Sequence, residues 1–343
     1  MPAVTVQALR DTSRRILEAA GVPERDAAII ADTIGYAHLR GLHTHGIGRL
    51  PLYVKKINTG CMRPDTPLRL MRDSGASALF DASDGFGQVA AFRAVKKGME
   101  KAREFGIAMV GVRGSNNFGA AGYFGRMAAE EGLACMVFAN SAPAVAPAGG
   151  HLPVFGTNPL CLALPGGIVS HPLVLDMATT VAARGKIRLA AKKGEKIPLG
   201  WALDAAGNPT DDPNAALKGT LVPIGGYKGA GLSMMIDALA GMMTGALFGG
   251  DVLQLGDNSG PSGSGHLFIV LDPTRFLSRE EYAERFDRLE KNTRACGDEG
   301  RVRLPGDSYD EALARNDQTV NLPDVQITEI NDLGRSMGLD IRL

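Results

Sequence analysis

The stretch GIAMVGVRGSNNFGAAGYFGRMAAEEGLACMVFANS, residues 106–141, decides the fold class of this chain. Residues 106–114 form a short apolar run typical of a buried strand, and residues 120–132 have the pattern of a helix. A second apolar run follows at residues 133–141. Because a strand, a helix and a strand follow one another directly, we predict an α/β sheet.

The same alternation continues on both sides of this stretch. Further strands are predicted at residues 77–83, 170–180 and 265–273, and further helices at residues 5–20, 23–38, 86–105, 229–247 and 278–296. We therefore expect a helical N-terminal region at residues 1–75, packed with the C-terminal segment at residues 275–343. An α/β domain is expected between them, at residues 76–274.

Composition excludes several classes of protein. The chain has 343 residues, of which 45% are hydrophobic, so it can bury one large core or two intimate ones. Its 37 Lys and Arg balance 37 Asp and Glu, so no basic field favours nucleic acid or an anionic membrane as a partner. The four cysteines are far apart in sequence, and the N-terminus has no apolar signal core, which indicates a reducing cytoplasm.

The common nucleotide and hydrolase motifs are missing from the sequence. We find no Gly-x-Gly-x-x-Gly after a strand and no Gly-x-x-x-x-Gly-Lys-[Ser/Thr] phosphate loop. Gly-x-Ser-x-Gly and His-Glu-x-x-His are also missing. A dinucleotide enzyme of the usual Rossmann type is therefore unsupported.

The segment GLHTHGIGRL, residues 41–50, has three interpretations. His43 and His45 could bind a metal, as in amidohydrolases, if both lie on one face of a strand, but no cluster of further histidines accompanies them. One or both could instead be ordinary polar residues at a helix end, which is the favoured reading for His43. The third interpretation pairs His45 with Arg49. An arginine grips a carboxylate through two hydrogen bonds and a histidine exchanges a proton, which suits reduction of a 2-oxo acid.

Three other segments are candidates for binding. Asn116 or Asn117 could enter a cleft at the end of a strand, or simply belong to a capped turn. The segment at residues 176–180 is predicted to begin a helix whose N–H groups suit a phosphate, the alternative being an ordinary capped helix. Lys228 stands among glycines before another helix and is either a phosphate contact or a surface lysine.

Several segments together resemble one family, the malate/L-lactate dehydrogenase type-2 or sulfolactate dehydrogenase-like oxidoreductases. The matching segments, in family order, are THGIGRLPLYVKKINTG, GSNNFGAAGYF, ANSAPAVAPAGG, FGTNPLCLALP, LDMATTVAARGKI, IPLGWALDAAGNPTDDP, PIGGYKGAGLSMM, GHLFIVLDP and RLPGD. The resemblance implies a mixed-sheet α/β fold without a Rossmann fingerprint, in which residues 76–274 bind the cofactor. It also implies a homodimer and NAD- or NADP-dependent interconversion of small 2-oxo and 2-hydroxy acids, or reduction of a cyclic imino acid.

The resemblance also implies roles for single residues. His45 would be the proton donor, Arg49 the carboxylate partner, and Thr44 would occupy a hydroxyl position that is usually serine. The implied cofactor contacts are Asp176, Met177, Ala178, Thr179, Thr180, Lys228, Gly229, Pro305, Gly306 and Asp307. No metal is implied. Asn117 stands where the family usually has a histidine, and asparagine cannot exchange a proton near neutral pH, which places more weight on His45.

The substrate and the choice between NADH and NADPH stay open at this point. Arg184 and Lys186 could meet a 2′-phosphate, although basic residues after a strand are common. An amidohydrolase using His43 and His45 is the alternative from another enzyme class, which a stoichiometric bound zinc would favour. A member that keeps the fold and binds NAD(P)H without turnover is the non-enzymatic alternative.

Overall fold

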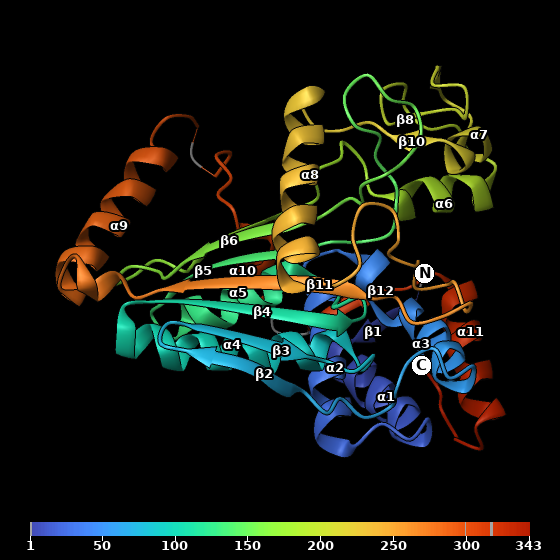
Figure 1. Cartoon of the computed structure of the whole chain (residues 1–343), viewed down its shortest axis with the longest axis horizontal. Helices are drawn as coiled ribbons and strands as arrows, with labels where there is room; N and C mark the ends of the chain where they lie inside the picture. Colours follow the sequence, from blue (N-terminus) through green and yellow to red (C-terminus); the bar gives the residue numbers. More distant parts are fainter. Residues whose placement is uncertain (1, 299, 316–317) are drawn as a thin grey trace.

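The computed structural model describes residues 2–298, 300–315 and 318–343 (Figure 1). The chain opens with β1 (Ala3–Thr5) and two helices that pack on each other, α1 (Val6–Ala19) and α2 (Glu24–Leu39). The Thr5 hydroxyl caps α1 by accepting a hydrogen bond from the Ala8 N–H over 3.1 Å. The predicted helical hairpin is therefore confirmed.

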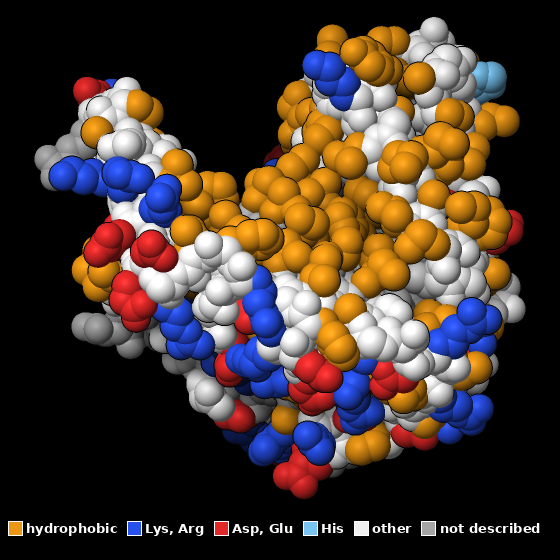
Figure 2. Space-filling model, turned by 60° about the vertical axis from the view of Figure 1, so that its left-hand side comes forward, with side chains coloured by type: hydrophobic (Ala, Val, Ile, Leu, Met, Phe, Trp, Pro, Cys, Tyr) orange, Lys and Arg blue, Asp and Glu red, His pale blue; other side chains and the backbone are white. Residues whose placement is uncertain are grey.

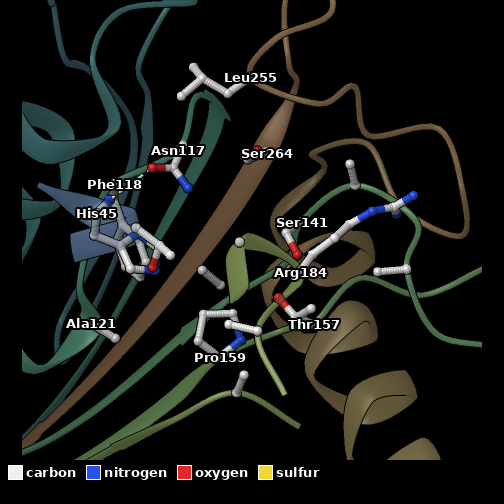
Figure 3. A pocket seen from close by; sticks show the side chains of 18 of the residues that line it. His45, Asn117, Phe118, Ala121, Ser141, Thr157, Pro159, Arg184, Leu255 and Ser264 are labelled. Carbon is white, nitrogen blue, oxygen red and sulfur yellow. Dashed lines mark hydrogen bonds between the residues drawn. The ribbon is translucent and has the colours of Figure 1, made fainter. Parts of the chain in front are cut away.

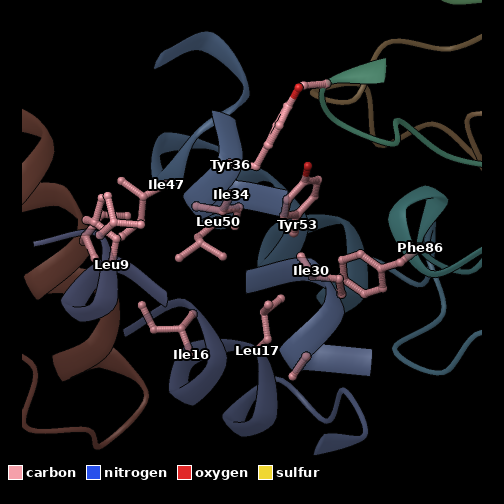
Figure 4. Close-up of a cluster of buried hydrophobic side chains, with 14 of the residues drawn as sticks. Leu9, Ile16, Leu17, Ile30, Ile34, Tyr36, Ile47, Leu50, Tyr53 and Phe86 are labelled. Carbon is pink, nitrogen blue, oxygen red and sulfur yellow. The ribbon is translucent and has the colours of Figure 1, made fainter. Parts of the chain in front are cut away.

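The N-terminal helices share a core with the short helix α3 (Leu50–Asn58). Figure 4 shows Leu9, Ile16 and Leu17 of α1 facing Ile30 and Ile34 of α2. Two elements from the other end of the chain join this region: β12 (Thr319–Asn321) pairs with β1, and α11 (Asp324–Ser336) contacts α3. The division of the chain near residues 75 and 275 stays a prediction.

A seven-stranded sheet forms the centre of the molecule. Its strands lie in the order β2 (Arg69–Ser74), β3 (Ser77–Asp81), β4 (Ile107–Ser115), β11 (Ser264–Leu271), β5 (Ala134–Ala139), β6 (Leu160–Leu164) and β7 (Leu173–Met177). Strands β3 and β4 are parallel, and the other neighbours are antiparallel. The predicted mixed-sheet α/β fold is confirmed, including the succession of strand, helix and strand that was read from residues 106–141.

Two helices pack against one face of this sheet, α4 (Gly87–Phe105) and α5 (Ala121–Glu130). They bury the alternate strand residues that point toward them, such as Val110, Cys161 and Ala163. The opposite face keeps large apolar side chains exposed, among them Met109, Leu162 and Leu164. The sheet is thus covered fully on one face only.

The remaining elements surround the sheet. They are α6 (Arg184–Lys193), β8 (Ala202–Leu203), β9 (Pro209–Thr210), α7 (Pro213–Lys218), β10 (Thr220–Leu221), α8 (Tyr227–Ala240), α9 (Arg279–Arg294), α10 (Asp307–Ala314) and the 3-10 turns η3 (Met242–Thr244) and η4 (Pro273–Arg275). Strands β8, β9 and β10 form a second small sheet beside α6 and α7. Within the described ranges, no helix is both long and apolar enough to cross a bilayer.

Two predicted boundaries are wrong. The helix predicted at residues 229–247 ends at Ala240 and is followed by the separate turn η3. The sequence predicts that the strand at residues 170–180 runs directly into a helix, but α6 begins only at Arg184. Residues 178–183 form an irregular connection instead, in which Thr180 makes a single β-bridge to Pro223. The free N–H groups at the start of α6 therefore lie beyond Thr180, near Arg184 and Gly185.

Candidate active site

One cavity of about 320 Å³ lies where the N-terminal helical region meets the ends of several strands of the sheet and the start of α6 (Figure 3). It is lined from five directions, by the turn after α2, the segment after β4, the ends of β5 and β7, α6, and the segment before β11. Four predicted catalytic residues line it together: Thr44, His45, Arg49 and Asn117. Residues far apart in sequence therefore meet around one space.

His45 and Arg49 lie on two consecutive 3-10 turns, η1 (His43–His45) and η2 (Ile47–Arg49). The buried ring of His38 holds this double turn, because its Nε2 accepts a hydrogen bond from the Ile47 N–H over 2.9 Å. Gly46 is required there, since a Cβ at Gly46 would lie 2.2 Å from that same Nε2 atom. His38 is thus a structural residue that fixes the position of His45.

The environment of His45 keeps its imidazole neutral. Burial, and to a lesser extent the charge of Arg49, lowers the pKa of His45 to about 3. Its Nδ1 atom is buried and has no hydrogen-bond partner among the described residues. A neutral imidazole facing a cavity can accept a proton from a bound hydroxyl group.

The Arg49 guanidinium is held at one nitrogen and free at the other two. Its Nε donates to the backbone oxygen of Thr44 over 2.5 Å. Neither Nη atom has a hydrogen-bond or ion-pair partner within the described part of the chain, and burial lowers the Arg49 pKa from its usual value. Two parallel N–H groups without a partner are what a carboxylate needs for bidentate binding.

The two asparagines after β4 have separate roles. Asn116 is buried, and its Nδ2 donates to the backbone oxygens of Asp84 and Gly85, both over 2.9 Å, so it anchors the strand end. Asn117 lines the cavity, and its Oδ1 accepts from the Gly119 N–H over 3.2 Å. The Asn117 NH₂ group is left facing the cavity as a donor (Figure 3).

Part of the predicted cofactor set also lines the cavity, namely Asp176, Met177 and Ala178 at the end of β7. The Asp176 carboxylate accepts from the Gly122 N–H over 2.9 Å, and burial raises the pKa of Asp176. Thr179 and Thr180 do not line it, since both are buried and donate to nearby backbone oxygens, those of Thr157 and Ala182.

The other predicted cofactor residues lie elsewhere. Lys228 is exposed in the first turn of α8, beside the buried Gly229. Pro305 and Asp307 line a second cavity of about 290 Å³ with His171 and Leu173, and Gly306 precedes α10 between them. Because Leu173 and Met177 are the two ends of β7, the two cavities lie about 13 Å apart along that strand.

The metal interpretation of His43 and His45 is not supported by the geometry. A metal pair requires both rings on one face of a strand, but the two histidines lie on a 3-10 turn, and His43 is exposed and packs edge-on against His38. The described residues contain no group of three or more His, Cys, Asp or Glu that could hold a metal ion.

The sequence analysis did not predict that His266 and Arg188 line the cavity. His266 on β11 lines the cavity, stacks on Phe118 at 4.7 Å between ring centroids, and shares a 2.8 Å hydrogen bond with the Ser115 hydroxyl. Arg188 was not considered, although it follows Arg184 by four residues on the predicted helix. The spacing of four residues could have indicated that Arg188 lies on the same helix face as Arg184. No neighbouring residue in the sequence indicated that His266 lines the cavity.

Comparison with known proteins identifies relatives across the whole chain. The sequence profile described as malate/L-lactate dehydrogenase matches residues 4–331. The chain is 38% identical over 331 residues to the L-sulfolactate dehydrogenase of Methanothermobacter thermautotrophicus, covering 96% of both chains. It is 38% identical to the (2R)-3-sulfolactate dehydrogenase (NADP(+)) of Chromohalobacter salexigens over 92% of each chain, and 37% identical to the Δ1-pyrroline-2-carboxylate reductase of Ancylobacter novellus over 94% of each.

The fold has solved counterparts as well. The sulfolactate dehydrogenase from Methanocaldococcus jannaschii superimposes with a TM-score of 0.91 at 33% sequence identity. The match covers 99% of this chain and 98% of that one. The α/β fold and the sequence matches therefore point to the same group of proteins.

Proposed function

Because this chain belongs to the malate/L-lactate dehydrogenase family, it is an NAD(P)-dependent oxidoreductase, and we propose that His45, Arg49 and Asn117 carry its reaction. The reaction interconverts a small 2-oxo acid and the matching 2-hydroxy acid. The single observation that supports these roles is that the imidazole of His45, the guanidinium of Arg49 and the amide of Asn117 line one cavity.

Arg49 binds the C1 carboxylate of the substrate in this proposal. Its two Nη groups offer the parallel donors that a carboxylate accepts, and the 2.5 Å hydrogen bond from Nε to Thr44 fixes the plane of the guanidinium. The Thr44 hydroxyl lies beside the same space. A substrate held in this way presents C2 and its oxygen to the rest of the cavity.

His45 moves the proton. During oxidation its neutral ring accepts the proton of the C2 hydroxyl as the C2 hydride leaves. During reduction the protonated ring returns that proton to the oxygen as C2 gains a hydride. The Asn117 NH₂ group donates a hydrogen bond to the same oxygen, where negative charge develops, but it exchanges no proton.

A nicotinamide cofactor fits the wall of this cavity. Part of its lining beside β5 and β7 consists of small residues, including Ala139, Ser141, Pro159 and Ala178, which leave space for a flat ring. When bound, the nicotinamide supplies or accepts the hydride. Asp176 and Met177 would hold the reactive half of the cofactor, while Thr179, Thr180, Lys228, Gly229 and residues 305–307 remain proposed contacts for its other parts.

A substitution at His45 tests this proposal. His45→Ala should lower kcat by at least about 100-fold while leaving the dissociation constant of NAD(P)H, measured by fluorescence titration, within roughly twofold. His43→Ala is the matched control, because His43 is exposed and does not line the cavity. Unchanged turnover in the His45 variant would remove the imidazole from the mechanism.

Reduction of a cyclic imino acid is the second candidate within the family, supported by the similarity to the pyrroline-2-carboxylate reductase. The same groups serve it, with Arg49 on the ring carboxylate and His45 protonating the nitrogen. A panel of 2-oxo acids and cyclic imines with NADH and NADPH separates the two. The amidohydrolase alternative has no support among the relatives.

A homodimer in the cytoplasm is proposed as the working state. Figure 2 shows hydrophobic side chains gathered in one broad area of the surface, and the exposed apolar residues include Met109, Leu162, Leu164, Met234 and Met235. An apolar area of this kind marks an interaction site. A second copy suits it because a chain of zero net charge does not repel itself. All four cysteines are free, as expected in a reducing compartment.

A further inference from the structure

We propose that Lys56 is a positioning residue of the active site, because its buried ammonium group holds one wall of the cavity in a fixed place relative to Arg49. The inference rests on the proposed function, in which Arg49 binds the acid substrate. Lys56 does not line the cavity itself, so it acts through a loop at residues 253–262, which we call the wall loop.

The wall loop precedes β11 and is closed at its neck. The Leu253 N–H donates to the Ser262 backbone oxygen over 3.1 Å, so the two ends of the loop lie together. The neck lines the cavity through Leu253, Gln254, Leu255 and Ser262, of which Figure 3 labels Leu255. The tip of the loop, residues 257–260, is not part of the lining.

Lys56 reaches this tip from α3. Its Nζ donates to the Asp257 backbone oxygen over 3.0 Å and to the Gly260 backbone oxygen over 2.9 Å. The Lys56 side chain is fully buried. An ammonium group is rarely buried in this way unless its donors are used, because burial without hydrogen bonds is costly. The two bonds therefore explain why a lysine occupies a buried position of this helix.

Two neighbouring side chains hold the same tip. The Thr59 hydroxyl donates to Oδ1 of Asn258 over 3.4 Å, and the Cys61 thiol donates to the Asn258 backbone oxygen over 3.2 Å. Thr59 and Cys61 follow directly after α3. The tip is thus held by side chains from one helix end, among which Lys56 carries the charge and makes two of the bonds.

The helix that holds the wall loop begins directly after Arg49. Lys56 comes seven positions later, which is close to two helical turns, so the two residues lie on the same side of the helix. Leu255 of the wall loop is buried in the same cluster as Leu50 and Tyr53 of α3. Helix α3 therefore joins Arg49 and the wall loop in one packed unit.

The wall loop is held less firmly on the side of α6. There the Arg188 Nη2 donates to Oε1 of Gln254 over 3.0 Å, and this bond is exposed to solvent. An exposed hydrogen bond between two long side chains adds little stability, because water competes for both groups. The buried bonds of Lys56 thus fix the position of the loop relative to Arg49.

The composition of the loop explains why it needs such a fixed point. Residues 256–265, GDNSGPSGSG, contain four glycines and few side chains that could pack. A chain of this composition is flexible unless something holds it, because glycine loses much conformational freedom on ordering. With the tip held by Lys56, the neck keeps the shape of the cavity in which the acid lies against Arg49.

Lys56→Met tests this role, because methionine fills a similar volume without the ammonium group. Lys55→Met is the matched control, since Lys55 is the preceding residue of the same helix and is exposed. For each protein, kcat and KM are measured with malate, 3-sulfolactate and lactate, the dissociation constant of NADH by fluorescence, and the melting temperature. Hydrogen exchange of the backbone amides, followed by mass spectrometry, reports on the wall loop directly.

We expect Lys56→Met to raise KM for the acid by roughly tenfold, while kcat changes by less than about threefold and the NADH dissociation constant by less than about twofold. The split arises because the loop shapes the space for the acid, whereas His45 is held by other elements. The amides of residues 253–262 should exchange faster than in the unaltered enzyme and in Lys55→Met.

Chemical rescue provides a second measurement. In Lys56→Ala, n-propylammonium replaces the carbon chain and the ammonium group that the substitution removes, and 1-propanol is the uncharged control. Added n-propylammonium should lower the raised KM, and 1-propanol should not. Equal effects of the two compounds would show that the ammonium group is not what holds the loop.

An unchanged KM in Lys56→Met, with or without a lower melting temperature, would make Lys56 a purely structural residue and overturn the proposal. The same rise in Lys55→Met would also overturn it. If Lys56→Met does not fold, Lys56→Gln keeps N–H donors on a slightly shorter side chain, and its KM should rise by at least about threefold. An unchanged KM in that variant has the same meaning.

The proposed function can fail separately. It fails if the unaltered enzyme oxidises none of the three acids while still binding NADH. Hydrogen exchange then still tests Lys56, since faster exchange of the wall loop in Lys56→Met supports its role in holding the loop, and unchanged exchange overturns it.

Discussion

The methyl group of Thr44 occupies the space that a side chain at residue 185 would need. A Cβ on Gly185 would lie 2.4 Å from Cγ2 of Thr44 and 3.0 Å from its Cβ. The side chain of Thr44 in the turn η1 therefore contacts the backbone at the start of α6. The resemblance implies a serine at position 44 in other members, and the glycine at residue 185 makes room for the extra methyl group of Thr44 here.

Gly185→Ala should disturb this contact. The added methyl overpacks the junction, and we expect about 1–3 kcal/mol lower stability and a higher KM for the acid substrate. In Gly185→Ala combined with Thr44→Ser, part of both effects should be recovered because the closest atom is gone. A double-mutant cycle on the free energy of unfolding and on KM measures the recovery. Additive effects would show that the two residues do not interact.

The pKa of His45 predicts the pH dependence of catalysis. With a pKa of about 3 in the free enzyme, His45 is already unprotonated at pH 6 to 8. The kcat/KM for oxidation of the 2-hydroxy acid should therefore be flat across that range. The kcat/KM for reduction, which needs the protonated ring, should fall about tenfold for each pH unit. Initial rates in both directions test this, and a break near pH 6.5 would show that His45 titrates normally.

The two neighbouring asparagines should separate catalysis from stability. Asn117→Ala removes the free amide donor of the cavity, so kcat should fall by about 100-fold with little change in melting temperature. Asn116→Ala removes two buried hydrogen bonds, so it should lower the melting temperature instead. Steady-state kinetics and thermal unfolding of both variants check this. If Asn116→Ala lowered kcat and Asn117→Ala lowered the melting temperature, the roles of the two asparagines would be reversed.

Buried histidines should make the protein sensitive to acid. Burial lowers the pKa of His38 to about 4 and of His266 to about 3, both below the value of about 6.5 in an unfolded chain. As pH falls below about 6.5, the unfolded state therefore binds more protons than the folded state, and stability is lost by up to about 1.4 kcal/mol per pH unit for each histidine. Denaturant unfolding between pH 7 and 5 measures this slope.

His266→Gln provides the control, because glutamine does not titrate. Its slope of stability against pH should be shallower than that of the unaltered protein, even if its stability at pH 7 is lower. An unchanged slope would mean that His266 is not a buried neutral group.

The exposed apolar surface predicts self-association. Met235 on α8 is exposed, and Met235→Glu places a charge within that surface. We expect it to convert a dimer into a monomer in light scattering coupled to size-exclusion chromatography. Val325→Glu on α11 is the matched control, since Val325 is exposed on another helix. A dimer that persists in Met235→Glu would place the contact elsewhere.

The sequence by itself determined the strand–helix–strand succession at residues 106–141 and the helical hairpin, and it predicted that His45 and Arg49 lie together, as the cavity shows. These features depend on periodicity and on residues only four positions apart, which a linear pattern records. For the two asparagines after β4, the sequence left open a cleft residue or a capped turn, and the structure places Asn117 in the cavity.

Only the tertiary structure decided what surrounds these residues. It placed His266, 221 positions after His45, in the same cavity. It also showed that α6 begins at Arg184 and not within residues 176–180, where the sequence predicted a helix start. Through that shift Arg184 and Arg188 face the cavity while Thr179 and Thr180 turn away from it. The physical reason is that the order of the strands and the packing of the helices decide which distant segments line the cavity. The local sequence of one segment carries no information about which other segment it will contact.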